Sequence, residues 1–211
     1  MKSEQIIMVV PREDLFENNE HYFEGFRHAD VKDFETNILQ NHIWMKRGIA
    51  EEDPNHKQPI AYCLIVNPQQ KKVFAFQRGL KDEHYGEKRL QGKHSWGVGG
   101  HIEQFDTAEG NPIYNSMLRE IEEEIECNGS MEPKVLGYIN SDQDDVSKVH
   151  FGVLYLIETD AVDVRPRDNE MAAGSLKTIE DLDKICNSDD CTVEEWSKIA
   201  LEPLKRYFEG I

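Results

Sequence analysis

The stretch that decides the fold runs from Trp96 to Gly129 and reads WGVGGHIEQFDTAEGNPIYNSMLREIEEEIECNG. Its centre, residues 119–127, holds five glutamates in nine residues, with isoleucines between them at helical spacing. At about 100° per residue, such a helix gathers carboxylates on one face. The members of that face are Glu120, Glu123 and Glu124. The opposite face is expected to be buried, and its residues are Tyr114, Leu118, Ile121 and Ile125.

Three carboxylates on one helix face repel one another. A hard divalent cation relieves such repulsion, because it prefers several oxygen ligands. The alternative is a face that is only solvated, since glutamate favours helices by its propensity alone. The turn signals on either side of the helix favour the metal site.

These turn signals bracket the helix. Gly99 and Gly100 allow a tight turn and a close approach of the backbone to a ligand or metal. Asn111 is placed as an N-cap, with Pro112 at the first helical position. We expect the helix to run to about Cys127, where Asn128 and Gly129 supply a left-handed stop.

Composition limits the class of protein. The 211 residues suffice for one domain with an extension, and 31% of them are charged. The net charge of −17 repels a nucleic acid duplex and an anionic membrane. It leaves room for a small phosphorylated substrate held by a metal and a local basic patch. Without a predicted signal peptide or apolar span, we expect the cytoplasm, where the four cysteines would be free thiols.

We expect two regions: an extension over residues 1–58 that packs on the main domain, and the main domain over residues 59–211. Strands are predicted near 5–10, 60–66, 72–77, 135–139, 148–158 and 174–177. Helices are predicted near 31–40, 178–185 and 192–208, the last with a capping box of Thr192 and Glu195. This order indicates an α/β protein with a mixed sheet between helices.

The stretch resembles the Nudix box, in which Gly, five residues, Glu and seven residues precede Arg-Glu-U-x-Glu-Glu-x-Gly-U, U being a bulky aliphatic. Residues 119–124, REIEEE, match its core, and Gly100 matches its first Gly. Here five extra residues separate Gly100 from Arg119. We assign the position of the first Glu to Asp106, with Asn111 as the alternative. Glu126 stands where the family has its second Gly. The form "GHIE…NPI…REIEEE" is similar to a bacterial subgroup of predicted Nudix phosphoesterases.

The resemblance implies an α/β/α sandwich with a mixed sheet and a metal-dependent hydrolase. Such enzymes cleave a pyrophosphate bond in a nucleoside diphosphate linked to another group, when water attacks phosphorus beside Mg²⁺ or Mn²⁺. The implied metal ligands are Glu120, Glu123, Glu124 and the carbonyl of Gly100. Arg119 would orient a carboxylate and act with Glu120 and Glu123 in catalysis, and Glu103 is a candidate outer ligand.

The sequence leaves the substrate-binding residues and the general base open. Arg78 and Lys93, with Lys88 and Arg89, could meet phosphates, and Trp96 or Tyr85 could stack on a base; a solubilising loop and a core tryptophan are the alternatives. The general base is a glutamate of the box or an acid from another loop, and the outside candidates are Asp142, Asp144, Asp145 and Glu170. His94, His101 and His150 are expected to be structural.

Two other functions remain open. One is a Nudix-like module that binds a nucleotide or regulates without cleaving it, which the inserted residues and Glu126 favour. The other is isomerisation of a small diphosphate on the same fold. Because many relatives dimerise, a homodimer is one expected state of the chain.

Overall fold

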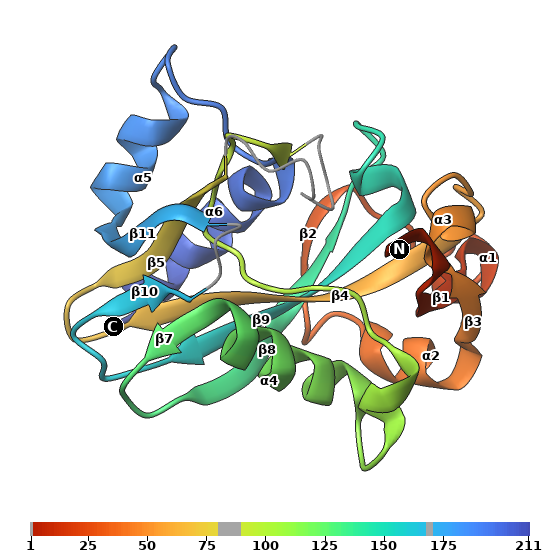
Figure 1. The fold of residues 1–211 in the computed structure, drawn as a ribbon. Coiled ribbons are helices and arrows are strands. Elements are labelled where there is room, and N and C mark those ends of the chain that lie inside the picture. Colours follow the sequence, from red (N-terminus) through yellow and green to blue (C-terminus); the bar gives the residue numbers. More distant parts are fainter. Residues whose placement is uncertain (1, 80–89, 168–170) are drawn as a thin grey trace. The chain divides into compact units, whose positions relative to one another are not determined.

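A computed structural model describes residues 2–79, 90–167 and 171–211 (Figure 1). The strands are β1 (Ile6–Pro11), β2 (Gly25–His28), β3 (Ile43–Lys46), β4 (His56–Asn67), β5 (Lys72–Arg78), β6 (His94–Ser95), β7 (Ile125–Cys127), β8 (Glu132–Asn140), β9 (His150–Glu158), β10 (Val164–Pro166) and β11 (Met171–Thr178). The α-helices are α1 (Arg12–Leu15), α2 (Phe34–Asn41), α3 (Arg47–Ala50), α4 (Pro112–Glu124), α5 (Ile179–Cys186) and α6 (Glu195–Glu209). The expected α/β class is confirmed.

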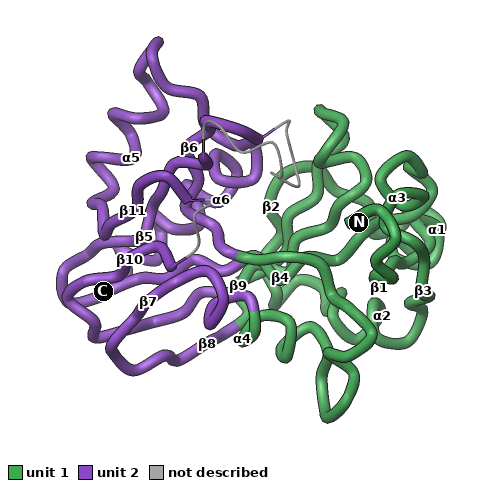
Figure 2. The backbone as a smooth tube through the Cα atoms, in the orientation of Figure 1, with its two compact units in different colours: residues 1–62, 99–119, 135–155 green, residues 63–98, 120–134, 156–211 purple. Residues whose placement is uncertain are grey.

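The chain forms two compact units, each built from three segments (Figure 2). Unit 1 comprises residues 1–62, 99–119 and 135–155, and unit 2 comprises residues 63–98, 120–134 and 156–211. The strands are hydrogen-bonded in the order β11-β5-β4-β9-β8-β2. Strands β4, β8 and β9 and helix α4 contribute residues to both units.

Unit 1 contains the whole N-terminal region. Strand β1 pairs antiparallel with β3 and, at its end, with β4, while β2 pairs with β8. The core is aromatic: rings pack around Phe34 at centroid distances of 5.1–6.3 Å, mostly edge-to-face, with Tyr138 and Phe151 stacked. The members are Phe16, Phe23, Phe34, Tyr138 and Phe151. Such pairs add about 0.5–1.5 kcal/mol each beyond the burial of their area. Residues 1–58 thus share one core with residues from β8 and β9.

Unit 2 is built on the hairpin of β4 and β5. Strand β11 pairs with β5 over nearly its whole length, and β6 pairs with the end of β5. Helix α5 begins with a capping box of Thr178 and Asp181. The helices α5 and α6 lie beside this sheet, and β7 and β10 pair in a separate two-stranded sheet (Figure 1).

Two helix boundaries differ from the expectations. Helix α6 begins at Glu195 with Glu194 as its N-cap, so the capping box predicted from Thr192 is wrong. The reason is tertiary: the carbonyl of Thr192 accepts a hydrogen bond from the backbone N–H of His94, 2.7 Å away, which holds this residue in extended pairing with β6. No helix in the described part of the chain is long and apolar enough to cross a membrane.

Helix α4 is also shorter than predicted. It ends at Glu124, and residues 125–127 form strand β7 instead of a last helical turn closed by Asn128 and Gly129. Strand β7 pairs with β10, which places Glu126 opposite Arg165. The residue that replaces the second Gly of the box therefore lies in a strand beside a residue of opposite charge.

The segment before α4 runs along β4 within unit 1. Gly99 lies so close to this strand that a Cβ atom there would be 1.8 Å from the carbonyl oxygen of Ala61. Gly99 also has a φ of 154°, which side-chain-bearing residues rarely adopt. Only glycine fits this approach.

We therefore expect Gly99→Ala to lower the free energy of unfolding by about 3 kcal/mol or more, because backbone must move to relieve the overlap. Urea denaturation measures this loss. Gly210→Ala is the matched control, since its new Cβ would meet atoms at 3.6 Å, an ordinary contact. Equal stability of the two variants would mean that the segment does not lie against β4 in this way.

A polar network joins the N-terminal region to the loop after β8, within unit 1. Asp142 accepts hydrogen bonds from Arg12, from Tyr22 (3.0 Å) and from Lys57 (3.0 Å), while its backbone N–H donates to Glu24. Lys57 is fully buried, and burial lowers its pKa to about 8. Burial by itself raises the pKa of Asp142, but Arg12 and Lys57 outweigh it and hold the pKa well below its ordinary value.

This network predicts a loss of stability in acid. Because the pKa of Asp142 is lower in the folded state than in the unfolded state, its contribution is present above about pH 4 and is lost as the pH falls below that value. Asp142→Asn should flatten the decline in unfolding free energy between about pH 5 and pH 3, measured by urea titration. Glu132→Gln, a change at an exposed site, should leave the decline unchanged. Parallel curves for the wild type and Asp142→Asn would contradict the network.

Candidate metal site and its supporting residues

The sequence predicts that the glutamates of α4 lie opposite its apolar face. The structure shows a different arrangement. The buried stripe of α4 consists of Ile113, Met117 and Ile121, whereas Tyr114 and Leu118 are exposed. At about 100° per residue, Glu120 and Glu124 project along this same stripe. Both are half-buried, and Glu124 turns its Oε2 atom into the interior, while Glu123 is exposed.

The charge of the two inward glutamates reaches strand β4 in unit 2. The thiol of Cys63, on β4, is fully buried, and burial followed by the negative charges of Glu124 and Glu120 raises its pKa well above the ordinary value. Both carboxylates therefore act on one point of the protein interior. A negative potential in a place of low polarity favours a cation.

The end of α4 is held by Arg167 of unit 2. Its backbone N–H donates to the carbonyl of Glu124 at 2.8 Å, and its guanidinium Nη1 donates to the carbonyl of Glu122 at 2.6 Å. These bonds satisfy carbonyls that the helix itself leaves without partners, and a cation there also complements the helix dipole. The last turn, which carries the glutamates, is therefore fixed at its end.

Arg119 binds the carboxylate of Asp106, within unit 1. Its Nε and Nη2 atoms donate to the two oxygens of Asp106 at 3.1 Å each, and Nη2 also donates to the carbonyl of His101 at 3.0 Å. The side chain of Asp106 is only 3% exposed. Asp106 also accepts the backbone N–H of Glu103 at 2.8 Å, in a capping box of the short 3-10 helix Gln104–Thr107. Asp106, which we assign to the position of the first Glu of the box, is thus the carboxylate that Arg119 orients.

The remaining members of the predicted metal set belong to different units. Gly100 is half-buried in unit 1, between Gly99 and His101, and the three glutamates are in unit 2. Asn111 caps α4 as expected, since its Oδ1 accepts the N–H of Ile113 at 2.9 Å. Five inserted residues therefore leave the helix start unchanged.

The predicted phosphate contacts lie together in unit 2. The backbone N–H of Arg78 donates to the carbonyl of Lys93 at 2.9 Å. The guanidinium Nε of Arg78 donates to Glu194 at 2.8 Å, and both of these side chains are nearly buried. Lys93 is half-buried. Tyr85, Lys88, Arg89 and the base candidate Glu170 lie outside the described residues.

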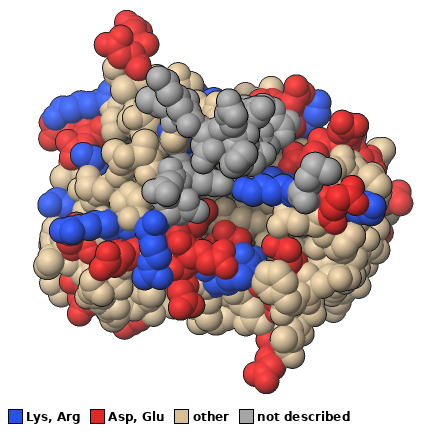
Figure 3. Space-filling view, viewed as in Figure 1, with Lys and Arg blue, Asp and Glu red and all other residues tan. Residues whose placement is uncertain are grey.

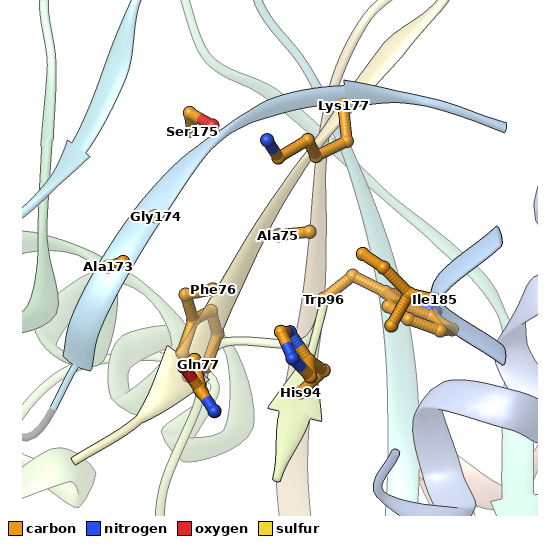
Figure 4. A pocket seen from close by; sticks show the side chains of 10 residues that line it. All are labelled: Ala75, Phe76, Gln77, His94, Trp96, Ala173, Gly174, Ser175, Lys177 and Ile185. Atoms are coloured by element: carbon orange, nitrogen blue, oxygen red, sulfur yellow. The ribbon is translucent and has the colours of Figure 1, made fainter. Parts of the chain in front are cut away.

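Trp96 lines a pocket between β5, β6, β11 and α5 (Figure 4). The pocket has a volume of about 200 Å³, and His94, Lys177 and Ile185 are among its other lining residues. Burial and the charge of Lys177 lower the pKa of His94. The ring of Trp96 is fully buried, and ligand pockets usually measure about 300–1,000 Å³. Stacking of a nucleobase on Trp96 would therefore require neighbouring side chains to move.

The loop acids considered as bases have structural roles in unit 1. Asp142 belongs to the network of Arg12 and Lys57, and its lowered pKa makes it a poor proton acceptor. Asp144 accepts the backbone N–H groups of Val146 and Ser147. Asp145 forms an ion pair with Lys148.

Sequence reasoning missed a group of side chains in unit 1. One ligand atom of Glu51, of His101 and of His150 all lie within 4.8 Å of one another. The three residues are far apart in the sequence, and only His101 lies in the box-like stretch, so spacing alone could not connect them. From the sequence, only structural roles are expected for His101 and His150.

Charges of both signs mix on the surface. On the face drawn in Figure 3, acidic side chains are spread among lysines and arginines. Positive charge on this face is therefore broken into small areas, which suits a small anionic ligand better than a long polyanion.

The pair of Asp106 and Arg119 yields a stability prediction. Asp106→Ala leaves a largely buried guanidinium without its carboxylate, so the free energy of unfolding should fall by about 3 kcal/mol. Chemical denaturation measures the change, and Glu109→Ala, in the exposed inserted loop, should alter stability by less than about 0.5 kcal/mol. A small effect of Asp106→Ala would show that the pair contributes little.

Comparison with known proteins supports the fold. No protein-family profile matches the chain. The Bacillus subtilis protein YmaB is 33% identical over 216 residues, which cover 97% of this chain and 99% of YmaB. Tm1382, provisionally described as a Nudix hydrolase, is 29% identical with a TM-score of 0.76, over 96% of this chain and 100% of Tm1382. The Nudix domain of Shewanella oneidensis NrtR, solved with ADP-ribose, has a TM-score of 0.54 at 13% identity, over 72% of this chain and 88% of that domain, and so shows the fold alone. The expected α/β Nudix fold with its mixed sheet is confirmed, and the chain belongs to the family of YmaB.

Proposed function

We propose that the protein is a metal-dependent Nudix hydrolase that cleaves a pyrophosphate bond in a nucleoside diphosphate linked to another group. The observation that carries the proposal is the position of Glu120 and Glu124, which are half-buried along the same stripe of α4 as the buried Ile113, Met117 and Ile121. The full-length similarity to Tm1382 and the Nudix fold support it. The assignment to a phosphoesterase-like subgroup is part of the same proposal.

The donor set suits Mg²⁺ or Mn²⁺. Glu120, Glu123 and Glu124, all in unit 2, offer carboxylate oxygens, the ligands that these ions prefer. A bound ion would supply charge neutralisation for the phosphate oxygens. The pKa of Cys63 is raised by burial first and then by the negative charges of Glu124 and Glu120, and such negative charge is what a cation site needs.

The protein's own groups have separate tasks in this proposal. Arg119 orients Asp106 and, through the carbonyl of His101, the segment that carries Gly100. Arg167 keeps the last turn of α4 in place. Glu123 is the exposed member of the glutamates, so we assign it, with Glu120, the orientation and deprotonation of the attacking water. The ion pairs of Asp142 and Asp145 argue against a base from their loop.

Phosphate recognition is proposed for Arg78 and Lys93, which are joined through their backbones. Of the two, Lys93 is the better candidate, because Arg78 already binds Glu194. Trp96 would contact the base only after a rearrangement of its pocket. The ADP-ribose bound by the NrtR domain makes ADP-ribose the first compound to test.

Activity can be tested with a panel of ADP-ribose, nucleoside diphosphate sugars and dinucleoside polyphosphates, each with and without Mg²⁺ or Mn²⁺. Glu120→Gln, Glu123→Gln and Glu124→Gln should each lower kcat by about 10²–10³-fold, because each removes charge needed for the transition state. Glu122→Gln is the matched control, since its side chain is exposed and only its carbonyl is used, by Arg167. Full activity of Glu123→Gln and Glu124→Gln would overturn the metal assignment.

Metal binding should also stabilise the native state, because only the folded helix gathers the carboxylates. At a concentration of ten times Kd, Mg²⁺ or Mn²⁺ should raise the free energy of unfolding by about 1.4 kcal/mol. This corresponds to an increase in Tm of roughly 3–6 °C. Thermal denaturation with and without millimolar metal measures the shift, and the triple variant E120Q/E123Q/E124Q should show none. An unchanged Tm in the wild type would argue against a preformed site.

A module that binds a nucleotide without cleaving it is the second candidate. The exposed inserted loop and the position of Glu126 in a strand favour it, because both depart from the box. Nucleotide binding without turnover under any metal would identify this function. In either case we propose that the ligand is a small molecule. We also propose a cytoplasmic location, which the four free cysteines support. A homodimer is a further proposal, which light scattering can test.

A further inference from the structure

A second set of metal-ligand side chains occupies unit 1, apart from the glutamates of α4. Glu51 follows the last residue of α3, His101 follows Gly100, and His150 is the first residue of β9. The Nε2 atoms of the two imidazoles are 3.2 Å apart. One carboxylate oxygen of Glu51 lies within 4.8 Å of both histidine ligand atoms.

The ring of His150 is oriented as in a metal ligand. Its Nδ1 atom lies 2.7 Å from the carbonyl oxygen of Val146, and a carbonyl can only accept, so Nδ1 carries the proton. In the neutral ring, Nε2 then directs a lone pair at His101. A backbone carbonyl that fixes the tautomer in this way is the usual outer partner of a ligating histidine.

A buried amide completes the surroundings of the cluster. Gln58 is fully buried, and its Oε1 accepts a hydrogen bond from Nε2 of His101 at 2.7 Å, so this nitrogen carries the proton when no ion is bound. An ion at this nitrogen would displace that proton and replace the hydrogen bond to Gln58. The amide Nε2 atom of Gln58 has no hydrogen-bond partner among the described residues. A buried amide donor without a partner costs free energy, and a water or other ligand completing a metal shell would satisfy it.

The spacing fits a tetrahedral ion. Zn–N bonds of about 2.0–2.1 Å at the tetrahedral angle place two ligand nitrogens roughly 3.3–3.4 Å apart. The observed 3.2 Å is close to this separation. Two imidazoles and one carboxylate suit Zn²⁺ and its neighbours in the first transition row, whereas Mg²⁺ prefers oxygen ligands alone.

Neighbouring charge moderates the affinity. Arg47 donates through Nε to Oε1 of Glu51 at 3.2 Å, so an ion must share this carboxylate with a guanidinium. The carboxylate has two oxygens, which permits such sharing. We expect binding in the range of roughly micromolar Kd rather than the tighter binding of all-cysteine sites.

From these contacts we infer that Glu51, His101 and His150 form a transition-metal site of the Zn²⁺ class, separate from the proposed Mg²⁺ or Mn²⁺ site on α4. The site joins the N-terminal region to the segment after Gly100 and to the start of β9. Because the carbonyl of His101 also accepts from Arg119, an ion here would stiffen the segment that carries Gly100. The inference does not depend on hydrolase activity.

The test uses full-length protein freed of metal with a chelator, in the variant E120Q/E123Q/E124Q, so that the glutamates of α4 do not contribute. Titration calorimetry with Zn²⁺ should give one ion per chain, and Co²⁺ should produce the visible absorption of a low-coordinate complex with nitrogen ligands. His150→Gln should abolish both signals. In the wild-type chain, His150→Gln should likewise remove one bound Zn²⁺ per chain, which covers the case that the triple variant does not fold.

Glu51→Gln provides the sharpest comparison, because it removes one charge at a site only 19% exposed and leaves the shape unchanged. We expect it to weaken Zn²⁺ binding by about 10–100-fold. The matched control is Glu52→Gln, the exposed neighbour, which should bind like its parent. The absence of Zn²⁺ binding in both backgrounds, or equal binding by Glu51→Gln and Glu52→Gln, would overturn the inference.

Discussion

The structure depends on two carboxylates that lie where an amphipathic helix would place apolar residues. Glu120 and Glu124 continue the buried stripe of Ile113, Met117 and Ile121, and their charge adds to the effect of burial in raising the pKa of the Cys63 thiol. Charge on the buried side of a helix costs free energy unless it is compensated. In the proposed function a divalent cation would provide such compensation, which would connect the packing of α4 to the proposed chemistry.

The residues around α4 hold this arrangement at both ends. Asn111 caps its start, and Arg167 binds carbonyls of its last turn. Arg119 donates two hydrogen bonds to the carboxylate of Asp106. The five inserted residues precede Asn111, so they lengthen an exposed loop without shifting the cap. The departures from the box therefore affect the connections of the helix and not the spacing of its glutamates.

The N-terminal region contributes more than a cover for the core. Its aromatic rings share a core with Tyr138 and Phe151, and its Lys57 and Arg12 hold the loop that carries Asp142. It also supplies Glu51 to the cluster with His101 and His150. Residues 1–58 are thus part of the same compact unit as the segment that precedes α4.

The sequence by itself determined the local features: the strands around 60–66 and 72–77, the Asn-Pro start of α4, the free cysteines and the carboxylate-rich box. These follow from periodicity, turn chemistry and a motif, which act over a few residues. It misplaced the end of α4, because strand β7 is selected by pairing with β10, almost forty residues later in the chain. It predicted the buried face only in part: Ile121 and Ile125 are buried, but Tyr114 and Leu118 are exposed. These two fit the helical period as well as the buried Met117 does. Only the tertiary structure decided that Glu120 and Glu124 face inward and that Glu51, His101 and His150 meet, because such contacts depend on how distant segments pack and not on their spacing.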